Sequence, residues 1–195
     1  MQLSKEIGLT QSSAWFMQDR IRQACVNDTS DKLVGMVEVD ETYLGSKEKN
    51  KHANNRTKGT QGRSTKTKTA IVGMQFRNGV VKATKIDKVN SNAIQNMINK
   101  AIDKNATRYT DEAPIYKGIA GYKQRMVNHS AAEFVSGAVN TNGIESILAI
   151  LKRGYNGVFH YFSNKPIGRY VDGFAFRLNA GNVWIHTWNR INSLI

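Results

Sequence analysis

The sequence predicts one α/β domain, a mixed five-stranded sheet flanked by helices, with a short helical segment on its N-terminal side. Two β-rich runs in the first half are joined by Asn78-Gly79, a dipeptide typical of a tight hairpin turn. Farther along the chain, two segments have apolar residues at helical spacing, and short strand-like runs lie between these two segments. This alternation indicates an α/β layout, and a length of 195 residues suits one domain with a small appendage.

Residues 1–34 are expected to form the helical N-terminal segment. Gly8 separates two short helices, Thr10 is a candidate N-cap of the second, and Trp15 and Ile21 contribute to its apolar face. The pattern resembles the second half of a helix-turn-helix, a motif that reads DNA. An arm that only packs on the domain is an equally good interpretation, and the residues do not decide between the two.

A strand with an acidic centre is predicted at residues 36–44. The run M-V-E-V-D-E-T-Y-L is rich in β-branched and aromatic residues and ends at Gly45. Period-two alternation places Asp40 on one face with Glu38 and Leu44. A charge in the middle of a buried strand is costly unless it is paired or bound to a metal, so Asp40 is a candidate site residue.

The segment 46–68 lacks hydrophobic periodicity and is strongly basic. The chain carries 28 Lys and Arg against 15 Asp and Glu, a net charge of +13, and eight of those cations fall here against one acid. This charge favours a polyanionic partner over the substrates of an ordinary near-neutral metabolic enzyme. A solvated, disordered loop is the alternative to DNA contact. The candidate DNA-binding residues of the segment are Lys47, Lys49, Lys51, Arg56, Lys58, Arg63 and Lys66.

The remaining elements of the main domain, expected over residues 35–180, follow from turn signals and apolar periodicity. They are, in order, strands at 69–76 and 80–86, a helix over 91–102 capped by Ser91 or Asn92, a short strand that ends on Asp111, a turn or helix through Tyr116 and Tyr122, a strand at 126–129, and a helix over 142–153 stopped by Gly154. A further helix is expected around residues 170–178. Residues 181–195 are expected to form a helical tail. This order is that of RNase H-like domains, in which the first and fourth strands are neighbours, and it is shared by other α/β layouts.

Three carboxylates would then converge: Asp40 in the middle of the first strand, Asp111 at the end of the fourth strand, and Glu145 in the first turn of a helix that packs on the sheet. Carboxylate oxygens suit Mg²⁺ or Mn²⁺, and such a cluster fits a site for two ions that act on phosphodiesters. Each residue also has a structural interpretation. Asp111 could cap a helix, Glu145 could form a capping box with Asn142, and Asp40 could pair with a cation.

Other polar residues lie close to these acids in the predicted layout. Lys152 lies seven positions after Glu145, on nearly the same helix face, and Arg153 follows it, so both could hold a DNA strand. Alternatively, these two cations only stabilise the C-terminus of the helix by interacting favourably with its dipole. The auxiliary candidates, for a phosphate contact, proton transfer or support of the site, are His129, Asn142 and His160.

Several segments together resemble the ISXO-type insertion-sequence transposases of the DDE superfamily, over about residues 3–180 and in the same order. They are V-E-V-D-E-T-Y-L-G-S-K-E-K-N-K-H (37–52), Y-T-D-E-A-P-I-Y (109–116), V-N-H-S (127–130), T-N-G-I-E-S (141–146), L-K-R-G (151–154) and R-Y-V-D-G-F-A-F-R-L-N (169–179).

The resemblance implies a DDE transposase with an RNase H-like domain, a divalent metal, and cutting and joining of DNA at transposon ends. It maps the acids of the DDE motif onto Asp40, Asp111 and Glu145, and implies a homodimer or higher oligomer on DNA. Members carry a Cys-rich zinc ribbon ahead of the segment 3–24, whereas this sequence has one cysteine, Cys25. A truncated DNA-binding remnant and a structure-selective nuclease are the alternative functions.

No apolar run is long enough for a membrane span, and the N-terminus lacks the hydrophobic core of a signal peptide. We therefore expect a cytoplasmic protein associated with the prokaryotic nucleoid. The single Cys25 also excludes an intramolecular disulfide and any Cys₄ or Cys₂His₂ zinc site within this chain.

Overall fold

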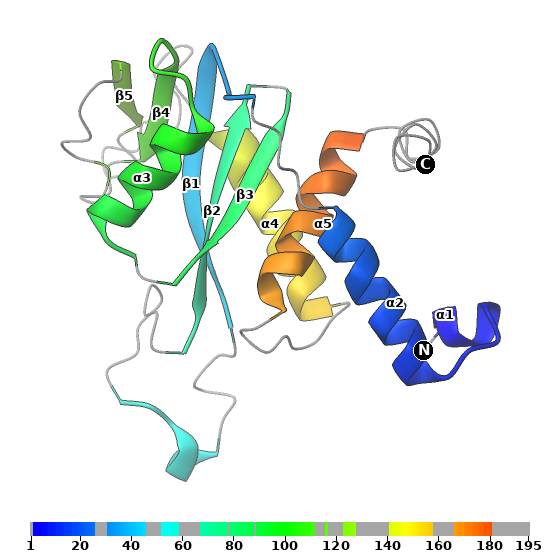
Figure 1. Ribbon diagram of the computed structural model, residues 1–195. Coiled ribbons are helices and arrows are strands. Elements are labelled where there is room, and N and C mark those ends of the chain that lie inside the picture. Colours follow the sequence, from blue (N-terminus) through cyan, green and yellow to red (C-terminus); the bar gives the residue numbers. More distant parts are fainter. Residues whose placement is uncertain are drawn as a thin grey trace.

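The computed structural model describes residues 2–25, 31–45, 52–58, 67–77, 79–87, 89–111, 116, 123–127, 141–157 and 166–180. At its centre is a five-stranded sheet with the order β3-β2-β1-β4-β5 (Figure 1). The strands are β1 (Met36–Leu44), β2 (Thr69–Phe76), β3 (Val81–Ile86), β4 (Thr107–Asp111) and β5 (Lys123–Val127). The first three strands form an antiparallel meander, and β4 and β5 continue the sheet in parallel, so the predicted mixed sheet is confirmed.

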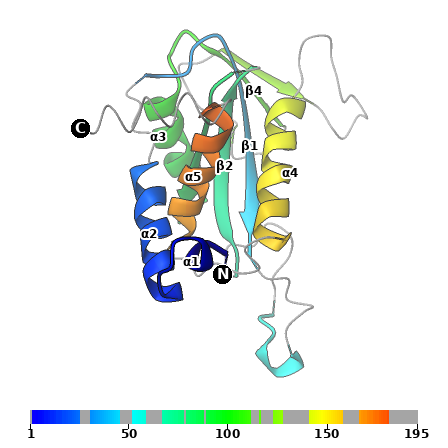
Figure 2. The same ribbon diagram turned by 90° about the vertical axis from the view of Figure 1, so that its right-hand side faces the viewer.

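Helices cover both faces of this sheet and divide the core in two. They are α1 (Gln2–Glu6), α2 (Gln11–Ala24), α3 (Ser91–Ala101), α4 (Asn142–Gly157) and α5 (Ile167–Ala180), with a 3₁₀ turn η2 (Ala53–Asn55). Figure 2 shows α3 and α4 on opposite sides of the sheet. Val37 and Val39 pack toward α3, whereas Leu44 packs toward α4 and α5. The face alternation predicted for β1 is therefore confirmed.

The helix boundaries show where local signals were sufficient and where packing overrode them. Thr10 caps α2 by accepting a hydrogen bond from the Ser13 amide, as predicted. The cap of α3 is Asn90, which accepts from the Ala93 amide, so the predicted cap at Ser91 or Asn92 is wrong by one or two positions. Helix α4 continues through the predicted stop at residue 154, because Tyr155 is buried in the core shared with α5.

The fifth strand also differs from its predicted position. It spans Lys123–Val127 instead of 126–129 and pairs in parallel with β4 along its whole length, from Thr107↔Lys123 to Asp111↔Val127. The position of this strand depends on its neighbour more than on its own composition, because the hydrogen bonds between paired parallel strands join backbone groups and do not depend on the side chains. The polar sequence of β5 carried no strong strand signal.

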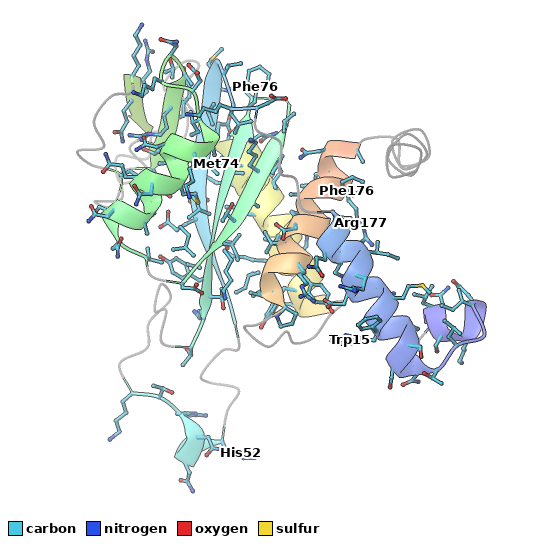
Figure 3. The ribbon with its side chains drawn as sticks, viewed as in Figure 1. Trp15, His52, Met74, Phe76, Phe176 and Arg177 are labelled. Atoms are coloured by element: carbon cyan, nitrogen blue, oxygen red, sulfur yellow. The ribbon has the colours of Figure 1, made fainter. Side chains whose placement is uncertain are left out.

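The N-terminal segment packs on the domain through α2 and α5. Asp19 forms an ion pair with Arg169, and the Arg22 guanidinium lies 4.0 Å from the Tyr170 ring centroid. The expected apolar face is wrong at two positions, because Trp15 (labelled in Figure 3) and Ile21 are both exposed. Polar contacts join the helix to the domain, and the large apolar residues of α2 are exposed, whereas the small Ala14 is buried.

The edge of the sheet at β3 is partly covered by α5. The Asn179 side-chain amide accepts a hydrogen bond from the Val81 amide and donates one to the Val81 carbonyl, both at 2.7 Å. This pair of bonds reproduces what an antiparallel strand would offer at that residue. None of the described helices is long and apolar enough to cross a membrane.

Candidate active site

Two of the three predicted acids lie on neighbouring strands at the same level. Strands β1 and β4 pair in parallel from Met36↔Thr107 to Glu38↔Tyr109, and two further steps in this register bring Asp40 level with Asp111. Residues paired in a parallel ladder point to the same face. The prediction that the first and fourth strands are neighbours is therefore confirmed, and it brings these two acids together.

The third acid, Glu145, lies in the first turn of α4, on the sheet face that carries Asp40. The helix approaches closely because Gly73, the β2 partner of Asp40, has no side chain. A Cβ built on Gly73 would lie 2.8 Å from Cδ1 of Ile144 and 3.0 Å from Cδ2 of Leu148. Any larger residue at this position would push the helix, and with it the third acid, away from the sheet.

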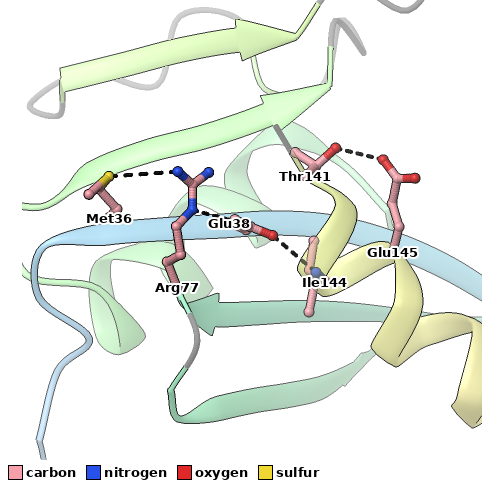
Figure 4. A network of polar contacts seen from close by, with 6 residues as sticks. All are labelled: Met36, Glu38, Arg77, Thr141, Ile144 and Glu145. Atoms are coloured by element: carbon pink, nitrogen blue, oxygen red, sulfur yellow. Dashed lines mark hydrogen bonds and ion pairs between the residues drawn. The ribbon is translucent and has the colours of Figure 1, made fainter. Parts of the chain in front are cut away.

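The Glu145 carboxylate is held by the residue before the helix. The buried Thr141 hydroxyl donates a hydrogen bond of 2.6 Å to Oε1 of Glu145 (Figure 4). The predicted capping box with Asn142 does not form, because Asn142 is already the first residue of α4 and is exposed. Thr141 takes the position before the helix instead, and it orients the acid directly.

The three acids line a single cavity of about 580 Å³. Asp40, Asp111 and Glu145 share this lining with two lysines, Lys68 and Lys152. The other lining residues are Glu41, Thr42, Tyr43, Leu148 and Ala149. The cavity thus combines carboxylates and ammonium groups, a combination that can hold cations and phosphates side by side.

Burial is the main cause of an unusual ionisation of Asp40. Burial, with smaller contributions from the negative charges of Glu41, Asp111 and Glu145, raises the pKa of this carboxyl from 3.8 to about 7. The Glu41 amide, which donates to Oδ1 at 2.8 Å, acts in the opposite direction. A cation bound among these acids would relieve both the burial penalty and the repulsion.

The donor chemistry of the cavity suits a hard divalent cation. Carboxylate and hydroxyl oxygens are the ligands that Mg²⁺ and Mn²⁺ prefer. Across the described residues, no group of three His, Cys, Asp or Glu side chains is assembled so that it could hold an ion as it stands. The acids therefore line a common cleft with the right charge and ligand type, and they are not gathered around one point.

Glu41 is fixed from the opposite side of the sheet. The hydroxyl of Tyr116 donates to Oε2 of Glu41 at 2.6 Å, and this tyrosine is completely buried in the core beneath α3. Burial raises the pKa of Tyr116, with the Glu41 charge as a further cause, so its hydroxyl keeps the proton that it donates. This contact joins residues far apart in the chain, and no sequence signal pointed to it.

The predicted basic and auxiliary residues are distributed unevenly. Of those the structure describes, Lys152 lines the cavity, whereas Arg153, Arg56 and Lys58 are exposed and do not. The other candidates, Lys47, Lys49, Lys51, Arg63, Lys66, His129 and His160, lie outside the described residues. Lys68 was not singled out from the basic segment, although its place just before a predicted strand was a usable signal.

The comparison with protein families agrees with this geometry. Residues 32–179 match the ISXO2-like transposase domain, a stretch that includes the whole sheet, α3, α4 and nearly all of α5. No curated protein matches the chain. The match spans well over half of the 195 residues and brings with it the RNase H-like fold that the strand order indicates. The chain therefore belongs to the ISXO2-like family of DDE transposases.

Proposed function

We propose that this domain catalyses metal-dependent DNA cleavage and strand transfer at the ends of an insertion sequence. The observation that carries the proposal is the presence of Asp40, Asp111 and Glu145 in one cavity together with Lys68 and Lys152. The family is enzymatic and acts on DNA, which supports both the reaction class and the partner. We further propose that the chain works as a homodimer or higher oligomer on DNA.

In this proposal the three acids hold Mg²⁺ or Mn²⁺, with two ions in the working site. Bound ions would supply Lewis-acid polarisation of the phosphoryl oxygens. The protein supplies orientation: Asp40 lies on the central strand with Oδ1 fixed by the Glu41 amide, and the Thr141 hydroxyl fixes Glu145. Ligands held in this way lose little freedom when an ion binds.

Helix α4 sets the path of the DNA strand. Glu145, Leu148, Ala149 and Lys152 all line the cavity, and their spacing puts them on one face of the helix. At 1.5 Å per residue, Lys152 lies about 10 Å along the axis from Glu145. Lys68 precedes β2 at the end where β1 finishes and lines the same cavity. A strand whose reacting phosphate lies at the acids would place neighbouring phosphates at the lysines.

The reaction that fits this arrangement has two steps. Water attacks phosphorus in line, the bond from phosphorus to the 3′-oxygen breaks, and the element's end is left with a 3′-hydroxyl. That hydroxyl then attacks a phosphodiester of the target, joining the 3′-oxygen to the new phosphorus and releasing the target's own 3′-hydroxyl. Both steps are in-line displacements at phosphorus, so one acidic site can serve both.

A strand-transfer assay tests the proposal. The purified chain is incubated with Mg²⁺ or Mn²⁺, a duplex of the element's own end cut to expose its 3′-hydroxyl, and a plasmid target. Joined products are expected, and they should disappear when the metal is chelated. Cutting of branched DNA without joining would instead identify a structure-selective nuclease, and binding with neither activity would identify a remnant; both results contradict the proposal.

The two cavity lysines give a separate prediction on DNA binding. Lys68→Ala and Lys152→Ala should each weaken binding to all sequences alike and reduce the slope of log affinity against log salt by about one, because each loses one phosphate contact. Fluorescence anisotropy at several salt concentrations measures both quantities. Lys100→Ala, an exposed lysine on α3 that does not line the cavity, is the matched control. An equal change in this control would show that only net charge matters.

A further inference from the structure

A buried acid that the proposed reaction does not use lies two residues before Asp40. Glu38 is 2% exposed and points to the same face of β1 as Asp40. A carboxylate at this depth is costly unless its oxygens are paired. Both are: Oε1 accepts from Nε of Arg77 at 3.0 Å, and Oε2 accepts from the Ile144 amide at 3.0 Å (Figure 4).

The bond to Ile144 ties the sheet to the first turn of α4. Ile144 is the third residue of that helix, so its amide has no acceptor within the helix and needs one from elsewhere. Caps usually come from the residue just before a helix, whereas this one comes from a strand 106 positions away. A distant cap does more than satisfy an amide, because it fixes where the helix begins relative to the sheet.

The chain around this contact is shaped to permit it. A Cβ built on Gly143 would lie 2.8 Å from Oε2 of Glu38 and 2.8 Å from Oε1 of Gln75. Any side chain at this position would therefore occupy the space through which the carboxylate reaches the helix. The glycine in T-N-G-I-E-S has a specific steric role, and it concerns Glu38 directly.

Arg77 makes the buried charge tolerable and is itself held in place. Its guanidinium lies 4.8 Å from the ring centroid of Tyr109, and Nη1 approaches the sulfur of Met36 at 3.8 Å. These contacts keep the cation over the sheet, where it can compensate Glu38. The ion pair is thus part of a fixed network and is not a mobile surface pair.

We propose that Glu38 is a positioning residue: by holding the Ile144 amide it sets where the first turn of α4, and so Glu145, stands opposite Asp40. Glu145 is the next residue after Ile144, and its carboxylate is oriented by Thr141 from the same turn. The catalytic consequence rests on the proposed function. The structural consequence, a helix start fixed by a strand carboxylate, does not.

Three variants test the proposal. Glu38→Ala removes both acceptors. Glu38→Gln keeps one oxygen that can accept from Ile144 but presents an amide to Arg77, so it should rescue part of the effect. Val39→Ala is the matched control, because Val39 is a buried neighbour on the same strand and packs in the core beneath α3, whereas Ile144 packs in the other core.

Hydrogen exchange and Mn²⁺ affinity are measured beside strand transfer, because neither of them requires the protein to catalyse a reaction. Hydrogen exchange of the Ile144 amide should speed up about tenfold or more in Glu38→Ala relative to amides of α3, since a buried charged acceptor is lost. The affinity of the protein for Mn²⁺ is obtained from the free Mn²⁺ that electron paramagnetic resonance detects. In Glu38→Ala this affinity should be about 10 to 100-fold weaker, the usual cost of losing a group that orients a ligand. Val39→Ala should leave the affinity unchanged even if it lowers overall stability.

The outcomes separate the two proposals. Wild-type exchange and wild-type Mn²⁺ affinity in Glu38→Ala, or an equal loss of affinity in Val39→Ala, would overturn the role of Glu38. If Asp40→Asn binds Mn²⁺ as the wild type does, the proposed function fails, and the exchange result still decides the structural part. Should Glu38→Ala fail to fold, Gly143→Ala provides the same test, because its methyl group blocks the contact while the charge stays; unchanged exchange and affinity there would also overturn the proposal.

Discussion

Asn in place of Asp40 or Asp111 is expected to abolish metal-dependent DNA cleavage while leaving DNA binding within about a fewfold of wild type. Each substitution removes a charged ligand oxygen from the shared cavity and keeps the size of the side chain. Loss of a metal contact removes several kcal/mol of stabilisation from the reaction, which corresponds to a rate reduced by about a thousandfold or more. DNA binding depends mainly on cations, so it should persist.

The measurement is cleavage and joining at saturating Mn²⁺, with anisotropy on the same DNA to follow binding. Asp87→Asn is the matched control, since it makes the same chemical change at an exposed acid next to Lys85, outside the cavity. It should leave both rates unchanged. Retained cleavage in either Asp40→Asn or Asp111→Asn would contradict the assignment of these residues as metal ligands.

The same Asp40→Asn variant is expected to make the metal-free protein more stable at neutral and alkaline pH. In the folded wild type burial raises the pKa of Asp40 to about 7, against 3.8 for an ordinary aspartate. Between these two values the folded state binds more protons than the unfolded state, so stability falls as the pH rises through that window. Asparagine resembles the protonated acid and avoids the penalty.

The size of this effect follows from the difference in pKa. Each unit is worth about 1.4 kcal/mol, so the variant should gain roughly 2–4 kcal/mol in free energy of unfolding above pH 7. The gain should shrink between pH 7 and 4 and vanish below that range. Urea denaturation in a chelator at several pH values measures it, and a constant difference at all pH values would show that the titration of Asp40 is not its cause.

Metal should stabilise the wild type more than the Asp40→Asn variant. At pH 8 an excess of Mg²⁺ binds the folded wild type and stabilises it by mass action, whereas the variant has lost a ligand and should gain much less. Without metal, the wild type is thus expected to be less stable than Asp40→Asn. Added metal is expected to stabilise the wild type more than the variant. Equal stabilisation of both proteins by Mg²⁺ would show that the ion binds elsewhere.

The part of the site that could be predicted is the part that strand order determines. Asp40 and Asp111 become neighbours as soon as the first and fourth strands pair, and an RNase H-like element order indicated that these strands are neighbours; the structure shows that they pair in parallel. Glu145 could be placed in the first turn of a helix from the apolar spacing that follows it. These three positions depend on periodicity and connectivity, both of which a single sequence displays.

The supporting contacts could not be predicted, because they join residues that are distant in the chain. The alternation of β1 put Glu38 on the correct face, but only the packing of α4 reveals that its carboxylate meets the Ile144 amide. In the same way, burial of Tyr155 carries α4 past Gly154, where a local rule predicted an end. Propensities describe a segment alone, whereas these outcomes depend on what that segment touches.

The paired bonds between Asn179 and Val81 have a consequence for how copies of this protein can meet. An exposed edge strand invites another chain to add to the sheet, and such growth is a common route to aggregation. At the start of β3 that place is already taken by a side chain that imitates the missing strand. A second copy could extend the sheet from this residue only by first displacing Asn179, so a single side-chain amide blocks the edge at this point.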